Sequence, residues 1–128
     1  MAELTHVEMD EIADRLVGAI AAGDAEGVRA IYATDAQIWH NFDQVDQTVD
    51  QNLATLVGLH ARATGLAYTE IRRFLAPGGF VQQHVLIGEA KGGALHLPAM
   101  IRFWVEGGRI TRLEEYLDTA QAMVLYTG

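Results

Sequence analysis

The chain has 128 residues, half of them apolar and about a fifth charged, which is typical of one globular domain spanning residues 1–128 and excludes a disordered protein. Its net charge of −8 comes without any run of Lys or Arg, so no nucleic-acid partner is expected. No stretch approaches the ~20 apolar residues that cross a bilayer, the acidic N-terminal residues do not fit a targeting peptide, and cysteine is absent. A cytoplasmic protein without a membrane partner is therefore expected.

The chain is expected to begin with two antiparallel helices. Thr5 followed by Glu8 forms the pattern of a capping box, and apolar residues then recur at helical spacing until Gly23. Asp24 is suited to cap a second, short helix. A first strand is predicted at residues 36–42, where apolar and aromatic residues gather.

A third helix and a meander of strands are expected to follow. Thr48 and Gln51 repeat the capping-box pattern, and the helix that they open is predicted to end near Gly65. The apolar period then changes to alternation, and glycine pairs that favour tight hairpins separate four strands at 66–76, 80–90, 94–106 and 109–118. A short helix at 119–126 closes the chain. The predicted fold class is α+β, with a curved antiparallel sheet wrapped around helices that leaves a pocket.

Several short segments carry a more specific signal. They are Ala22-Gly23-Asp24, Tyr32-Ala33-Thr34-Asp35-Ala36, residues 109–118, Trp39-His40-Asn41 and Gln82-Gln83-His84. With the order of elements, they resemble the nuclear-transport-factor-2-like superfamily, a cone-shaped or cystatin-like roll, and in particular its polyketide-cyclase-like, ketosteroid-isomerase-like and limonene-epoxide-hydrolase-like branch. The resemblance covers nearly the whole chain and implies a small, largely apolar molecule bound inside the cone.

The chain departs from two of these families at their catalytic positions. In limonene-epoxide-hydrolase-like enzymes an Arg-x-Asp pair works with a terminal Asp; the resemblance places Gln82 and His84 at the pair and keeps Asp118. In ketosteroid-isomerase-like enzymes the carboxylate base corresponds to His40, and the two oxyanion donors correspond to apolar residues. The resemblance therefore favours neither reaction in its known form.

The candidate catalytic residues are His84, Asp118 and His40. An imidazole takes or gives a proton near neutral pH, and an Asp bonded to it fixes its tautomer. Alternation along the two strands favours a common inward face for His84 and Asp118. His84 is accordingly expected to be the base, oriented by Asp118, with His40 or Asn41 as an oxyanion donor. The expected substrate-binding residues are Asn41, Gln82, Trp39, Tyr116, Met100, His60 and Phe80.

Some of these assignments have alternatives. Asp118 also fits as the N-cap of the terminal helix, and a buried histidine is often a hydrogen-bonded structural residue. The register of the first strand points either His40 or its two neighbours inward, and His40 is favoured. Glu114 and Glu115 are expected to be solvated.

The expected function is that of an enzyme without cofactor or metal that moves protons on a small aromatic or alicyclic substrate, as an isomerase, lyase, cyclase or hydratase. The alternatives are a binding or assembly module without turnover, and an epoxide hydrolase with a His base. The histidine spacing does not fit a zinc site, and serine is absent. A homodimer is expected, because apolar residues are predicted on the outer face of the sheet. These residues are Leu95, Leu97, Ile101, Phe103 and Val105.

Overall fold

The computed structural model describes residues 3–128. Its helices are α1 (His6–Ala22), α2 (Ala25–Arg29) and α3 (Val49–Arg62), followed near the C-terminus by the 3-10 helix η1 (Gln121–Leu125). Its strands are β1 (Tyr32–His40), β2 (Asp46–Gln47), β3 (Ala63–Ala76), β4 (Gly79–Ala90), β5 (Gly93–Glu106) and β6 (Arg109–Leu117). The predicted α+β class and order of elements are confirmed, with the short strand β2 as an addition.

Side-chain caps determine where the two long helices begin. The Thr5 hydroxyl accepts a hydrogen bond from the Glu8 backbone N–H at 3.1 Å, and the Glu8 carboxylate accepts one from the Thr5 N–H at 2.9 Å. Thr48 and Gln51 repeat this arrangement at the start of α3. Because a capping side chain contributes about 1 kcal/mol to helix stability, the capping-box pattern located both helix starts correctly.

Two boundaries differ from the prediction because strand pairing extends further than the local sequence indicates. β1 begins at Tyr32, which pairs with Ile110 of β6. β3 begins at Ala63, directly after α3, because Ala63 adopts an extended backbone and pairs with Ala90 of β4. In both places, the backbone hydrogen bonds of the sheet override the local helix or loop preference.

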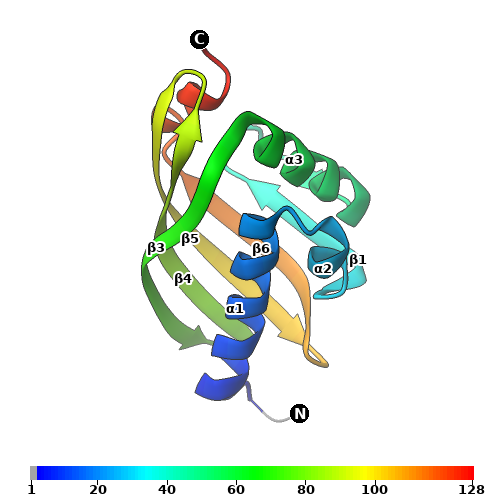
Figure 1. Ribbon diagram of the computed structural model, residues 1–128. Coiled ribbons are helices and arrows are strands. Elements are labelled where there is room, and N and C mark those ends of the chain that lie inside the picture. Colours follow the sequence, from blue (N-terminus) through cyan, green and yellow to red (C-terminus); the bar gives the residue numbers. More distant parts are fainter. Residues whose placement is uncertain (1–2) are drawn as a thin grey trace.

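The six strands form one curved sheet in the order β2-β1-β6-β5-β4-β3. β1 runs parallel to β6, and all other neighbouring strands are antiparallel. Figure 1 shows the helices gathered on one side of the sheet, where the long strands β3, β4 and β5 curve around them. An antiparallel sheet that is covered on one face alternates between inward apolar and outward polar side chains, and this alternation positions the site.

Two clusters of buried apolar side chains fill the space between the helices and the sheet. In the larger cluster, Leu16 of α1 packs with Phe80 and Phe103, whose rings stack at a centroid distance of 4.4 Å. The smaller cluster lies toward η1 and includes Leu86 and Leu97. Burial of one such side chain contributes about 1.5–3 kcal/mol. Residues of both clusters line the cavity described below, which therefore lies between them.

Strands β4 and β5 approach each other closely where their hairpin with β3 begins. A Cβ atom at Gly79 would collide with the backbone carbonyl of Phe103. Its neighbour Gly78 has a φ of 75°, which side chains disfavour. The glycine pair therefore serves the packing of the sheet as well as the turn that the sequence predicts.

The apolar residues expected on the outer face of the sheet lie inside it instead. Leu95, Leu97, Ile101 and Phe103 are at most 7% exposed, and Val105 packs against the same core. They point inward because the helices cover that face and need apolar partners. The reason given for a homodimer is therefore wrong, and the homodimer itself stays a prediction that sedimentation of the purified chain tests.

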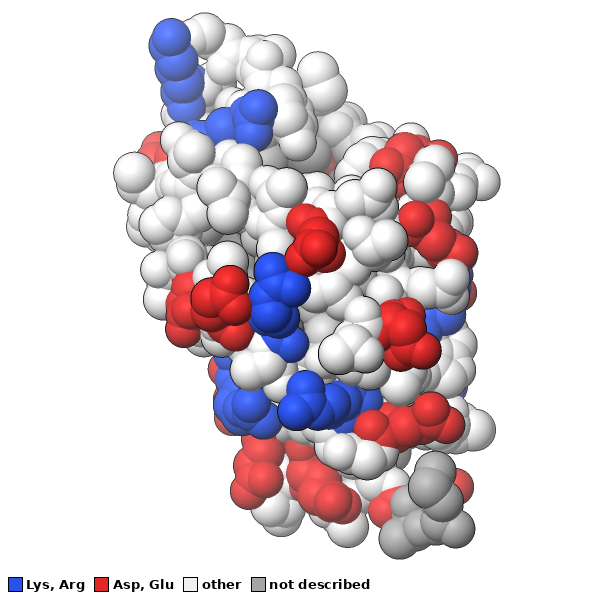
Figure 2. All heavy atoms as spheres, turned by 90° about the vertical axis from the view of Figure 1, so that its right-hand side faces the viewer, with Lys and Arg blue, Asp and Glu red and all other residues white. Residues whose placement is uncertain are grey.

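Charged side chains of both signs lie close together on the surface. Figure 2 shows basic side chains interspersed with acidic ones on one face of the molecule. Arg112, for example, pairs with Asp46 at 3.1 Å and with Glu114 at 2.9 Å. Within residues 3–128, no helix has both the length and the apolar character needed to cross a membrane.

Candidate functional site

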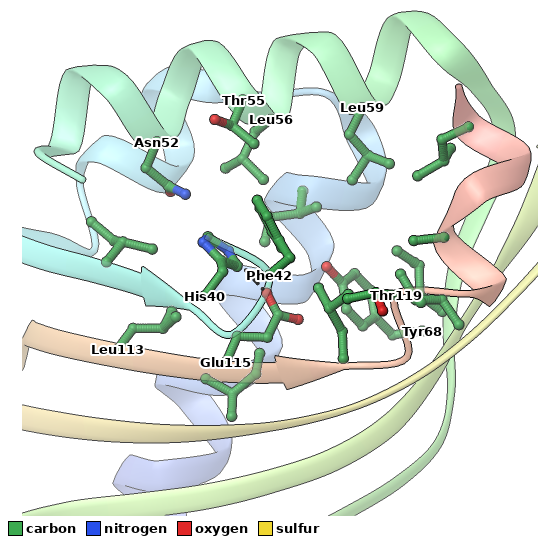
Figure 3. A pocket seen from close by; sticks show the side chains of 18 of the residues that line it. His40, Phe42, Asn52, Thr55, Leu56, Leu59, Tyr68, Leu113, Glu115 and Thr119 are labelled. Carbon is green, nitrogen blue, oxygen red and sulfur yellow. Dashed lines mark ion pairs between the residues drawn. The ribbon is translucent and has the colours of Figure 1, made fainter. Parts of the chain in front are cut away.

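A cavity of about 380 Å³ lies between α3, the concave face of the sheet and η1. Figure 3 shows α3 above it, with Asn52, Leu56 and Leu59 pointing down from the helix, and β1 and β6 below. Most of the lining side chains are apolar, including Leu16, Ile20, Ile38, Leu56, Leu59, Leu86 and Leu113. An apolar hollow with a few convergent polar groups is the usual form of a small-molecule site.

His40 and Glu115 form an ion pair in the wall of this cavity. His40 Nε2 lies 3.1 Å from Glu115 Oε1, and the two side chains are 9% and 18% exposed (Figure 3). The two residues are paired positions of the parallel strands β1 and β6, so both side chains point to the same face. His40 Nδ1 is buried without a hydrogen-bond partner. The imidazole therefore presents its hydrogen to the carboxylate through Nε2.

A chain of hydrogen bonds connects four other polar side chains near the cavity. The Tyr32 hydroxyl donates to Asn52 Oδ1 at 2.9 Å, and Asn52 Nδ2 donates to Gln47 Oε1 at 3.2 Å. Gln47 Nε2 donates to Thr55 Oγ1 at 3.1 Å, and Thr55 in turn donates to the Gln51 carbonyl at 3.2 Å. These groups satisfy one another, so β2 and α3 are held together beside the cavity.

Tyr68 of β3 supplies a second phenol to the cavity wall. Burial, with a smaller contribution from the negative charge of Glu115, raises the pKa of Tyr68 above its ordinary value. The same two causes raise the pKa of Tyr32. Both phenols therefore stay protonated near neutral pH and act as hydrogen-bond donors.

His84 lies inside the sheet but is not part of the cavity wall. It is 4% exposed, and its ring meets the Tyr68 ring edge-on at a centroid distance of 4.7 Å. Gln82 Oε1 accepts from Arg73 Nε at 2.8 Å, so Gln82 Nε2 faces His84 Nδ1, 2.9 Å away, and donates to it. Burial is the main cause that lowers the pKa of His84. His84 is therefore a neutral residue with its hydrogen on Nε2.

The predicted pair of His84 and Asp118 is wrong. The Asp118 carboxylate accepts hydrogen bonds from the backbone N–H groups of Ala120 and Gln121 at 3.0 and 3.2 Å, and from Gln121 Nε2 at 3.1 Å. The bonds from Gln121 are the main cause that lowers the pKa of Asp118. The carboxylate thus caps the turn into η1, as the alternative interpretation of the sequence had it.

Three of the predicted substrate-binding residues lie on the convex face of the sheet. The rings of Trp39 and Tyr116 pack at a centroid distance of 5.2 Å, and Met100 is the strand partner of Tyr116. Tyr116 is 54% exposed and Met100 is 38% exposed. They cannot line the cavity because alternation points them away from the helices.

The other four predicted binding residues have structural contacts. Asn41 bonds through its amide to the backbone of Leu117 at 3.2 and 3.1 Å, and Gln82 holds His84 as described. Phe80 is fully buried in the core. His60 is an exposed residue of α3 that packs over Gly23 of the α1–α2 junction. Of the catalytic and binding residues predicted, His40 alone lines the cavity.

Sequence reasoning missed Glu115 and Tyr68. Glu115 was expected to be solvated, because the last strand was given the opposite phase, with Tyr116 and Asp118 inward. A signal was present: Leu113 and Leu117 stand two residues on either side of Glu115, so alternation places a carboxylate in an apolar row. Tyr68 had no comparable signal, since β3 is interrupted by irregular pairing on both sides of it.

The chemistry available in the cavity is proton transfer and hydrogen bonding. Within residues 3–128, no group of three or more His, Asp or Glu side chains is placed to hold a metal ion. The polar groups that line the cavity are the His40–Glu115 pair, the phenols of Tyr32 and Tyr68, and the amide and hydroxyl groups bonded beside them.

Residues 13–113 match the SnoaL-like domain family, which covers most of the chain. The chain belongs to the SnoaL-like family. The matched segment includes His40 and ends two residues before Glu115. No curated protein matches this SnoaL-like chain significantly in sequence.

Solved structures with the same fold are similar over most of this SnoaL-like chain. PrhC from Penicillium brasilianum has a TM-score of 0.83 at 10% identity, over 93% of this chain and 85% of that chain. A protein from Shewanella denitrificans, described as a SnoaL-like polyketide cyclase, has a TM-score of 0.79 at 12% identity, over 95% and 98%. A protein from Bacillus subtilis, described as an isomerase, has a TM-score of 0.81 at 9% identity, over 94% and 93%. At these identities the likeness shows the fold alone, and the nuclear-transport-factor-2-like cone is confirmed.

Proposed function

We propose that this SnoaL-like protein is a cofactor-independent acid/base enzyme of the isomerase or cyclase type, acting on a small apolar ring compound in the cavity. The observation that carries the proposal is the ion pair of His40 and Glu115, 3.1 Å apart, in the wall of an otherwise apolar cavity. The descriptions of two similar structures as a polyketide cyclase and an isomerase support the same class of chemistry.

Glu115 is the proposed base. Its Oε1 atom is engaged by His40, and Oε2 has no protein partner among the described residues. Oε2 takes a proton from a carbon next to a substrate carbonyl: the C–H bond breaks, an O–H bond forms on Glu115, and the electron pair moves onto the carbonyl oxygen. Return of that proton to another carbon completes an isomerisation, and attack of the enolate carbon on a second carbonyl completes a cyclisation.

His40 and Tyr68 support this step from two sides. The His40 Nε2–H holds the carboxylate in one orientation, so His40 is a positioning residue in the proposed mechanism. The Tyr68 hydroxyl is a neutral donor in the same cavity and stabilises the negative charge that develops on the carbonyl oxygen. A positioned base contributes a factor of about 10² to 10⁴ to the rate, and the donor contributes further.

Hydrogen exchange tests the proposal without knowledge of the natural substrate. 2-Tetralone is an uncharged ring ketone with acidic hydrogens next to its carbonyl, and proton NMR in D2O follows their replacement by deuterium. We expect the protein to accelerate exchange over buffer, and Glu115→Gln to lower the acceleration by at least about 100-fold.

Glu114→Gln is the matched control, because the neighbouring Glu114 pairs with Arg112 outside the cavity. It is expected to retain the wild-type exchange rate. Equal rates for wild type and Glu115→Gln would contradict the proposed role of Glu115.

A further inference from the structure

We infer that the cavity selects an uncharged carbonyl compound with an acidic hydrogen beside the carbonyl, and that Glu115 excludes carboxylates from it. The inference extends the proposed function to the class of substrate and rests on the same site. It follows from the hydrogen-bonding groups that remain free in the cavity and from the charges in its wall.

Most polar groups near the cavity are already satisfied by protein partners. The Tyr32 hydroxyl and both ends of the Asn52 amide are used in bonds to each other and to Gln47. The Thr55 hydroxyl both accepts from Gln47 and donates to a backbone carbonyl. A ligand gains nothing by replacing these bonds, because each broken bond leaves a buried group unpaired.

Two groups remain free to meet a ligand. Glu115 Oε2 is an acceptor only, and the Tyr68 hydroxyl has no protein hydrogen-bond partner among residues 3–128. Figure 3 shows both side chains at the same cavity, from β6 and β3. The complementary ligand presents an acidic hydrogen to Glu115 and an acceptor oxygen to Tyr68. A carbonyl group and its neighbouring C–H bond meet both requirements with adjacent atoms.

The charges in the wall determine which ligands are refused. Among residues 3–128, no Lys or Arg lines the cavity, and Glu115 is its one carboxylate. The His40 N–H that faces the cavity side of the sheet is already bonded to Glu115. A carboxylate ligand at ~5 Å from Glu115 is repelled strongly enough to lose about 100-fold in affinity at an effective dielectric constant of ~20.

A matched pair of ligands isolates the effect of charge. 2-Acetonaphthone and 2-naphthoate share their ring system and their number of non-hydrogen atoms, and only the second is an anion at pH 7.5. Calorimetric titration of the wild-type protein is expected to give an affinity for the ketone about 100-fold higher than for the carboxylate. Glu115→Gln is expected to reduce that difference to less than about 10-fold, while Glu114→Gln keeps it.

A second variant covers the case in which Glu115→Gln does not fold. Tyr68→Phe removes the free donor and is expected to weaken ketone binding about 10-fold. Its control, Tyr116→Phe on the convex face, keeps wild-type binding. The inference is overturned if the wild-type protein binds no ketone, if it binds the carboxylate equally well, or if folded Glu115→Gln keeps the full difference.

The binding result and the exchange result separate the two proposals. A large ketone preference without any 2-tetralone exchange leaves the charge selection standing and removes the proposed enzymatic function. Exchange that depends on Glu115, together with equal binding of ketone and carboxylate, leaves the enzyme standing and removes the inference.

Discussion

His40 and Glu115 are direct neighbours across the one parallel strand pair of the described sheet, with Nε2 and Oε1 3.1 Å apart. The backbone N–H of Asn41 donates to the Glu115 carbonyl at 3.0 Å, so the strand pairing fixes both residues at the end of β1. The imidazole and the carboxylate therefore meet without any rearrangement, in a wall that is otherwise apolar. A charge pair held in this way is suited to proton transfer, because its orientation is set before a ligand binds.

Removal of His40 is expected to destabilise the protein strongly. His40→Ala leaves the buried Glu115 charge without its partner, which costs about 3–5 kcal/mol for a buried pair. His96→Ala, at an exposed histidine, is the control and should cost within about 0.5 kcal/mol. Urea unfolding at pH 7.5 measures both changes. Equal losses for the two variants would contradict the assignment of His40 to a buried ion pair.

Filling the cavity is expected to block ligands while the ion pair stays in place. Leu59 points from α3 into the cavity, so Leu59→Phe occupies part of its volume. Ketone affinity should fall by at least about 10-fold, equivalent to about 1.4 kcal/mol. Val57→Phe changes the same helix at a residue that is 58% exposed and serves as control. Unchanged ketone affinity in Leu59→Phe would show that the ligand binds elsewhere.

The stability of the protein is expected to fall between pH 7.5 and 5.5 because of His84. Burial lowers the pKa of His84 in the folded state below 6.5, so the unfolded chain binds the proton more readily. The stabilisation from the neutral ring is present above pH 6.5 and is lost as the pH falls toward the lowered pKa. The loss is at most about 1.4 kcal/mol per pH unit for one proton.

Urea unfolding of His84→Asn at both pH values isolates this contribution. The variant should lose less stability on acidification than the wild type, whereas His96→Asn should behave as the wild type. A His84→Asn protein with an undiminished loss would contradict the assignment. The lowered pKa values of Glu8 and Asp118 do not enter, since both carboxyls titrate below this range.

Asp118 is expected to stabilise the C-terminal turn and to leave proton transfer intact. Asp118→Ala removes three hydrogen bonds to Ala120 and Gln121 at the start of η1. Amide hydrogen exchange of η1 should therefore become faster, while exchange of 2-tetralone continues. A catalytic loss as large as that of Glu115→Gln would restore Asp118 to the site.

The sequence predicted most of the fold because strong local signals marked the elements. The capping boxes at Thr5 and Thr48 located two helices, and the glycine pairs located the hairpins of the meander. These signals act within a few residues of the chain. The parallel pairing of β1 and β6 joins segments that lie far apart in sequence, and no local pattern predicts it.

The site was harder to predict because it depends on the phase of each strand. The phase of β4 was assigned correctly, so His84 was placed inward, but its bonding to Gln82 depends on Arg73 of another strand. The phase of β6 was reversed, which exchanged Glu115 for Tyr116 and Asp118. One residue of slip moves every side chain of a strand to the other face.

A crystal structure of the protein with 2-acetonaphthone tests the central claim most directly. The account predicts the ketone in the cavity, with its carbonyl oxygen within hydrogen-bond distance of the Tyr68 hydroxyl, its methyl group against Glu115 Oε2, and the His40–Glu115 pair unbroken. A ligand bound outside the cavity, or a Glu115 side chain turned away from the bound ketone, would contradict it.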